Sequence, residues 1–185
     1  ADTQAFQIHL DAVEQRITSH TQAIIINSPN NPSGVVYTEE TLRGLAVLLE
    51  RKSAEYGHPI YIIADEPYRE LVYGDVTVPF IPCLYRNTIV CYSYSKSLSL
   101  PGERIGYVYV PGFADDSAAV YAAVSGAARV MGHVCPPTLM QKVIQLCAGE
   151  RPDLAAYDEN RNLLYNSLRE MGYECAKPDG AFYLF

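Results

Sequence analysis

The stretch HPIYIIADEPY, residues 58–68, places a short, largely apolar run directly before two acidic residues and a proline. A continuous run of this kind is typical of a strand that is buried in a parallel sheet. The stretch QAIIINSPN, residues 22–30, repeats the pattern, with a β-branched run that ends in turn-forming residues. Two such strands on either side of a helical segment predict an open α/β sheet.

The helical segment between these strands has a clear start. Thr38 is a suitable N-cap, and Glu39 and Glu40 follow it in the first turn, where the helix dipole favours negative charge. Apolar residues then recur at helical spacing to about residue 51, and a shorter pattern of the same kind covers residues 8–17. We therefore expect a helix at each place.

Two further strands follow, in NTIVCYSYSK, residues 87–96, and RIGYVYVP, residues 104–111. The connection between them is too short for the crossover that parallel neighbours need. The fourth strand should therefore run antiparallel to at least one of its neighbours.

The second half of the chain changes to helical patterns, which cover residues 115–131, 138–149 and 157–171. The closing stretch PDGAFYLF, residues 178–185, then predicts the start of a new β region. We expect a domain boundary between about residues 150 and 172, with the last helix as the connection.

Composition excludes several classes of function. The net charge of −7 comes without any basic run, so we expect no binding to nucleic acid. The sequence has no apolar stretch long enough for a transmembrane helix. Its five cysteines lack any CxxC pair and its four histidines are scattered, so we expect buried free thiols, a cytoplasmic location and no metal site.

Polar residues gather where the predicted strands end. In an open α/β sheet the ligand binds beyond the carboxyl ends of the strands, and residues at that edge lie close together. The residues that fall there are Asn31, Asp65, Tyr68, Ser93 and Lys96. We therefore expect the functional site at this edge of the sheet.

Lys96 allows two interpretations. It could be an ordinary solvated lysine at the end of a strand, or an amine nucleophile that forms a Schiff base. Arg104 lies eight residues further on, and a fixed cation nearby would favour the neutral, reactive amine. Arg104 could also form a phosphate clamp with Ser93, or simply pair with Glu103.

The other edge residues also have alternatives. Asp65 follows an apolar run, where an unpaired carboxylate is costly, so it should have a cationic partner such as a protonated pyridine nitrogen. Asp65 and Glu66 could instead cap a short helix. Asn31 and Tyr68 are ordinary turn residues when taken alone, but together they offer an amide and a phenol that suit a phenolate oxygen.

Three segments now carry a resemblance to a known family. In their order and separation, NSPNNPSG (27–34), ADEPY (64–68) and SYSKSLSLPGERIGY (93–107) resemble the class I/II aminotransferases of pyridoxal-phosphate-dependent fold type I. The stretch PDGAFYLF resembles the opening of the small C-terminal domain of that family. The resemblance therefore covers almost the whole chain.

The resemblance implies an architecture. Residues 1–150 would be a portion of the mostly parallel, three-layer α/β/α large domain that binds pyridoxal phosphate. Residues 151–172 would form a long connecting helix, and residues 173–185 would begin the small domain. The family's Gly-rich phosphate loop, its ring-stacking aromatic residue and its carboxylate-binding arginine have no counterpart here, so we expect a fragment that binds cofactor poorly and has little activity alone.

The resemblance also implies roles for the edge residues. Lys96 would form the Schiff base with pyridoxal 5'-phosphate and move the substrate proton, Asp65 would pair with the ring nitrogen, and Tyr68 would bind the ring 3-oxygen. Asn31 would share that oxygen, and the Asn31–Pro32 bond would be cis. The implied cofactor contacts are Asn31, Asp65, Tyr68, Ser93, Ser95, Lys96 and Arg104, the serines and the arginine serving the phosphate.

The implied reaction transfers an amino group between an α-amino acid and a 2-oxo acid, in an enzyme that forms homodimers. A carbon–sulfur β-lyase of the same fold would keep the same cofactor contacts. A non-catalytic sensor domain of a transcription regulator, binding the same cofactor, is an alternative from another class. An inactive α/β module with a structural lysine is the remaining alternative.

Overall fold

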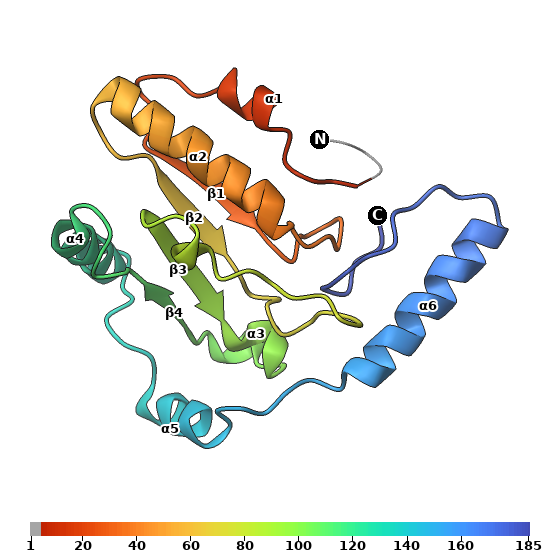
Figure 1. Cartoon of the computed structure of the whole chain (residues 1–185). Helices are drawn as coiled ribbons and strands as arrows, with labels where there is room; N and C mark the ends of the chain where they lie inside the picture. The colour runs from red at the N-terminus through yellow and green to blue at the C-terminus, as the bar shows by residue number, and fades with distance from the viewer. Residues whose placement is uncertain (1–4) are drawn as a thin grey trace.

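The computed structural model, which describes residues 5–185, contains a four-stranded mixed sheet (Figure 1). Strands β1 (Ala23–Asn27), β2 (Tyr61–Asp65) and β3 (Thr88–Ser93) are parallel, and β4 (Gly106–Tyr109) pairs antiparallel with β3. Their spatial order is β1-β2-β3-β4. The predicted α/β class, the mostly parallel sheet and the antiparallel fourth strand are confirmed.

Helices α1 (Leu10–Glu14) and α2 (Glu39–Tyr56) lie along one face of the sheet (Figure 1). The oxygen of the Thr38 side chain accepts a hydrogen bond from the Thr41 backbone N–H at 3.1 Å, so the predicted N-cap is confirmed. Helix α2 ends at Tyr56, five residues beyond the predicted end at about residue 51, and Gly57 caps it in the left-handed conformation with a φ of 76°. Helix α1 is shorter than the predicted 8–17.

The hydrophobic core lies between α2 and the sheet. Every second residue of β2 and β3 points toward α2, as the two-residue period of a strand requires. The central buried side chains are Leu42, Leu45 and Leu49 of α2 with Ile62, Ala64 and Val90 of the sheet. On the opposite face Ile25 is 71 % exposed. Within residues 5–185, no helix therefore covers that face of the sheet at Ile25.

Beyond β4 the chain forms three helices, α4 (Ser117–Val130), α5 (Thr138–Leu146) and α6 (Leu154–Glu170). They confirm the three predicted helical segments. They stand away from the sheet and are joined by extended connections (Figure 1), and none of the three contains a buried residue.

The predicted β region at the C-terminus is wrong. Residues 178–185 form no regular strand, and their one bridge joins Gly180 to Val72. The segment instead donates backbone hydrogen bonds to two loops: the Gly180 N–H bonds the carbonyl of Gly34 at 2.8 Å, and the Ala181 N–H that of Leu71 at 2.8 Å. These two N–H groups are therefore satisfied without a strand partner.

The boundaries proposed for the large domain (1–150), the connecting helix (151–172) and the small domain (173–185) stay predictions. All five cysteines are free thiols, as expected, but the expectation that they are buried is wrong, because each of them is exposed or only partly buried. Within residues 5–185, no helix combines the length and the apolar character needed to cross a membrane.

Leu45→Ala should test the core. Leu45 is fully buried at 0 % exposure, so removing its side chain should lower the free energy of unfolding by about 2–5 kcal/mol. Val47 lies on the same helix but is 65 % exposed, and Val47→Ala should change stability by about 0.5 kcal/mol or less. Urea unfolding of both variants measures the difference. Equal losses would place Leu45 outside the core.

Candidate functional site

The parallel register brings three strand ends to one edge. Asn27, the last residue of β1, is the register partner of Asp65, the last residue of β2. Asp65 is in turn paired with Cys91, two residues before the end of β3 at Ser93. The polar residues that follow these strands therefore lie together, as the sequence predicts.

Asp65 is half-buried and has a neutral partner. The Asn27 side-chain amide donates to the Asp65 carboxylate at 3.1 Å and to its backbone carbonyl at 2.9 Å. Burial raises the pKa of Asp65, against the opposing effect of the Asn27 hydrogen bond. Among residues 5–185 no ion pair joins Asp65 to a cation, so the carboxylate can receive one from a ligand.

Asn27 also shapes the loop after β1. Its side-chain carbonyl accepts a hydrogen bond from the backbone N–H of Asn31 at 2.6 Å. Both X–Pro bonds of this loop, Ser28–Pro29 and Asn31–Pro32, are cis, so the expected cis bond at Pro32 is confirmed. Sequence reasoning assigned no role to Asn27, although its place at the end of a strand was a usable signal.

Lys96 lies in the single helical turn α3 (Tyr94–Ser97) rather than in a strand or an open loop. Its Nζ is 5.8 Å from the centroid of the Tyr68 ring and 5.4 Å from that of the Phe182 ring. Aromatic faces attract an ammonium group at such distances. Within residues 5–185, the hydrogen bonds and ion pairs include none from this Nζ, so the amine is available to a ligand.

Tyr68 is buried and its hydroxyl pairs with that of Tyr183 at 2.6 Å. The Asn31 side-chain amide donates to the same Tyr183 hydroxyl at 3.2 Å. Burial raises the pKa of Tyr68 strongly. Sequence reasoning recognised PDGAFYLF as a motif, but it gave no role to Tyr183 or to Phe182.

The phosphate side of the predicted site is only partly assembled. Ser93 caps α3, and its hydroxyl lies 2.6 Å from that of Ser95. The backbone of Arg104 lies near Ser93, because Arg104 comes two residues before Gly106, the register partner of Ser93. Its guanidinium is exposed and donates to the Pro101 carbonyl at 2.9 Å, and no hydrogen bond joins it to either serine within residues 5–185. Within residues 5–185, no ion pair joins Arg104 to Glu103 either.

Glu66 does not cap a short helix, which was one interpretation of Asp65 and Glu66. Residues 67–70 form turns rather than a helix. Glu66 is 2 % exposed and pairs with Arg69 at 2.8 Å, and its other carboxylate oxygen has no hydrogen-bond partner among residues 5–185. Burial raises the pKa of Glu66, while the charge of Arg69 lowers it. Glu66 therefore belongs to the packing behind the site.

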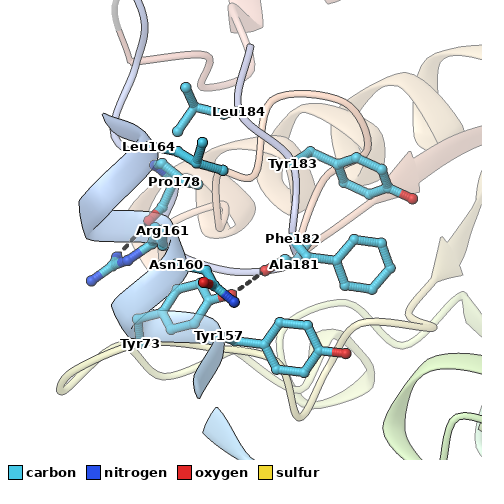
Figure 2. Close-up of a pocket in the computed structure, with 10 residues that line it drawn as sticks. All are labelled: Tyr73, Tyr157, Asn160, Arg161, Leu164, Pro178, Ala181, Phe182, Tyr183 and Leu184. Atoms are coloured by element: carbon cyan, nitrogen blue, oxygen red, sulfur yellow. Dashed lines mark hydrogen bonds between the residues drawn. The ribbon is translucent and has the colours of Figure 1, made fainter. Parts of the chain in front are cut away.

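A pocket of about 130 Å³ adjoins the site on the far side of the C-terminal segment (Figure 2). It is lined by α6 residues such as Arg161 and by Tyr73, whose hydroxyl donates to the Ala181 carbonyl at 2.5 Å. Figure 2 shows the rings of Phe182 and Tyr183 extending away from α6. No three His, Cys, Asp or Glu side chains of residues 5–185 are grouped closely enough to hold a metal ion.

Comparison with known proteins decides the family. The chain matches the family described as "Aminotransferase class I and II" over residues 1–185. The chain belongs to this family.

Proteins and solved structures that this chain resembles are also named as aminotransferases. The aspartate aminotransferase of Geobacillus stearothermophilus is 32 % identical, and the match covers 97 % of this chain and 45 % of that protein. A crystal structure of an aminotransferase from Eubacterium rectale has a TM-score of 0.97 and 62 % identity, covering 100 % of this chain and 46 % of that one. For a Thermus thermophilus aspartate aminotransferase variant the TM-score is 0.79 at 28 % identity, with 97 % and 46 % covered. The chain thus spans about half the length of these relatives.

The residues present fit the cofactor that this aminotransferase family implies. Pyridoxal phosphate has a basic ring nitrogen, an acidic 3-oxygen, an aldehyde and a phosphate. Asp65 offers a carboxylate that lacks a cationic partner, and Lys96 offers an amine without a polar partner, both in the part of the chain described. Hydroxyl and amide donors from Tyr68, Asn31 and Ser93 suit the two oxygen-bearing groups.

Asp65→Asn should stabilise the cofactor-free protein. Because burial raises the pKa of Asp65 above its ordinary 3.8, the folded state holds this proton more tightly than the unfolded chain, and stability falls as pH rises through this range. Removing the charge should raise the urea midpoint at pH 7, and the gain should shrink toward pH 4. Asp75→Asn, at an exposed site, should leave the midpoint unchanged. A lower midpoint for Asp65→Asn would contradict the effect assigned to burial.

Proposed function

We propose that this chain is the central part of a pyridoxal-phosphate-dependent aminotransferase, which transfers an amino group between an α-amino acid and a 2-oxo acid. The observation that carries the proposal is the placement of Lys96. Its Nζ lies over two aromatic rings, at the sheet edge that also holds Asp65, and it is available for covalent chemistry. Family membership and relatives named as aspartate and aromatic-amino-acid aminotransferases support the reaction class.

In this proposal, the residues at the strand ends hold and orient the cofactor. Asp65 pairs with the ring nitrogen and keeps it protonated, and the Asn27 amide fixes the direction of that carboxylate. Tyr68 and Asn31 donate to the ring 3-oxygen. Ser93, Ser95 and Arg104 hold the phosphate, for which the Arg104 side chain must turn away from the Pro101 carbonyl.

Lys96 has two tasks in the proposed cycle. Its Nζ would hold the cofactor covalently, and as a free amine it would take the proton from the substrate Cα and return it. The bound cofactor supplies an electron sink for the charge that this proton leaves behind. The Nζ lies over the rings of Tyr68 and Phe182, whose faces would help to hold the amine in place.

Further parts of the proposal concern the whole protein. It would act as a homodimer in the cytoplasm, and the free thiols of all five cysteines are compatible with a reducing compartment. A Gly-rich phosphate loop, a ring-stacking aromatic residue and a carboxylate-binding arginine would come from outside this chain. For this reason the chain alone should bind cofactor weakly and turn over little.

Borohydride trapping should identify the reactive lysine. The protein is incubated with excess pyridoxal 5'-phosphate and reduced with sodium borohydride, which converts a Schiff base into a stable pyridoxyl-lysine. Among the four lysines, peptide mapping should find the label on Lys96, and Lys96→Ala should remove it. Lys142→Ala, in α5, is the matched control and should keep it. A label that stays in Lys96→Ala would refute the assignment.

A product assay should then separate transfer from elimination. The complete enzyme is supplied with aspartate or an aromatic amino acid plus 2-oxoglutarate, and amino transfer yields glutamate and the 2-oxo acid of the donor. A β-lyase would instead convert cystathionine to homocysteine, pyruvate and ammonia. Glutamate formation without thiol release is the expected result, and thiol release alone would replace aminotransferase by lyase. Cofactor binding with neither product would favour the sensor alternative.

A further inference from the structure

We infer that Tyr183 is a positioning residue of the cofactor site: it orients the hydroxyl of Tyr68 and the amide of Asn31 toward the ring 3-oxygen. The inference rests on the proposed function. It adds a residue from the C-terminal segment to a site otherwise built from strand ends. The two hydrogen bonds of the Tyr183 hydroxyl, at 2.6 Å to Tyr68 and 3.2 Å from Asn31, carry it.

The donor of one of these hydrogen bonds is fixed, and the direction of the other, between the two phenols, is part of the proposal. The Asn31 amide nitrogen can only donate, so the Tyr183 oxygen accepts from it. When the Tyr183 hydroxyl then donates to the Tyr68 oxygen, the hydrogen of Tyr68 is left for an acceptor outside the pair. The second N–H of the Asn31 amide is likewise left. Both remaining donors suit one negatively charged oxygen, which is the chemistry of the ring 3-oxygen.

The same arrangement strengthens Tyr68 as a donor. A hydroxyl that accepts a hydrogen bond is polarised, and it donates its own hydrogen more strongly. Tyr68 is buried at 4 % exposure, where such an effect is screened least. A stronger donor at the 3-oxygen stabilises the negative charge on that oxygen, and this favours the covalent link at Lys96.

The backbone around Tyr183 is held firmly enough for a positioning role. The N–H groups of Asp179 and Gly180 both bond the Gly34 carbonyl, at 2.9 and 2.8 Å. A side chain at Gly180 would approach the Leu71 carbonyl at 2.7 Å, so this close seat requires glycine. On the other side, the Tyr73 hydroxyl and the Arg161 guanidinium bond carbonyls of the segment (Figure 2).

Aromatic contacts fix the ring itself. The Tyr183 ring meets the Tyr68 ring edge-on, with centroids 5.6 Å apart, and lies 4.9 Å from the Phe182 ring. Tyr183→Phe keeps these contacts and the backbone seat while it removes the hydroxyl alone. Its effects therefore report on the two hydrogen bonds rather than on packing.

The first test needs no cofactor. The phenol of Tyr68 is followed by NMR of protein labelled with ¹³Cζ-tyrosine, and its signal is assigned by its loss in Tyr68→Phe. The groups that face this phenol are Tyr183, Asn31, Asp65 and the Lys96 ammonium. Because the proposal has the Tyr183 hydroxyl donate to the Tyr68 oxygen, which stabilises the Tyr68 phenolate, Tyr68 should titrate at higher pH in Tyr183→Phe than in the wild type. Tyr121→Phe, at a site 64 % exposed on α4, should leave this titration unchanged.

The second test uses the loaded protein. Tyr183→Phe should raise the dissociation constant for pyridoxal 5'-phosphate by about three- to tenfold, the effect of losing one net hydrogen bond. It should also displace the pH at which the absorption of the bound cofactor changes, while Tyr121→Phe does neither. An unchanged dissociation constant and an unchanged Tyr68 titration would overturn the inference. Borohydride labelling of Lys96 in the same samples distinguishes this failure from a failure of the proposed function.

Discussion

The parallel register of β1, β2 and β3 is the constraint on which the site depends. It aligns Asn27 with Asp65, and Asp65 with Cys91, so that the chain leaves all three strands at one edge of the sheet. Core packing holds this register, because a shift by one residue would turn Ile62 and Ala64 away from α2. The chemistry at the edge therefore depends on the apolar side chains that pack between the sheet and α2.

The polar side chains at that edge are partly buried, so water solvates them incompletely. Their hydrogen-bond partners within residues 5–185 satisfy them only in part. Asp65 has a raised pKa and one neutral donor, and Tyr68 is buried against a second phenol. Burial of this kind costs stability unless a charged partner arrives. A ligand with a protonated ring nitrogen and an anionic oxygen supplies both partners, so these residues gain in the complex what they lose without it.

Much of this could be predicted from the sequence. The apolar runs before Asp65 and Ser93 predict two parallel strands, and Thr38 with two following glutamates predicts the start of α2. The residues of the edge follow from those strand ends. Local patterns of this kind carry the signal because strand alternation and helix caps involve neighbouring residues.

Other features depend on contacts between distant segments and could not be predicted. The C-terminal stretch has the composition of a strand, yet its backbone bonds the loops at Gly34 and Leu71, which places Tyr183 beside Tyr68. The guanidinium of Arg104 likewise bonds the Pro101 carbonyl within its own turn, where the Arg104 backbone has a positive φ of 51°. The spacing of Arg104 from Lys96 in the sequence does not predict this position. Sequence separation says little about side chains of this kind.

A crystal structure of the complete enzyme with pyridoxal 5'-phosphate tests the central claim most directly. The account predicts continuous density between the Lys96 Nζ and the cofactor aldehyde carbon, with the ring nitrogen within hydrogen-bond distance of Asp65. Density joined to another lysine, or a ring nitrogen facing away from Asp65, would contradict it.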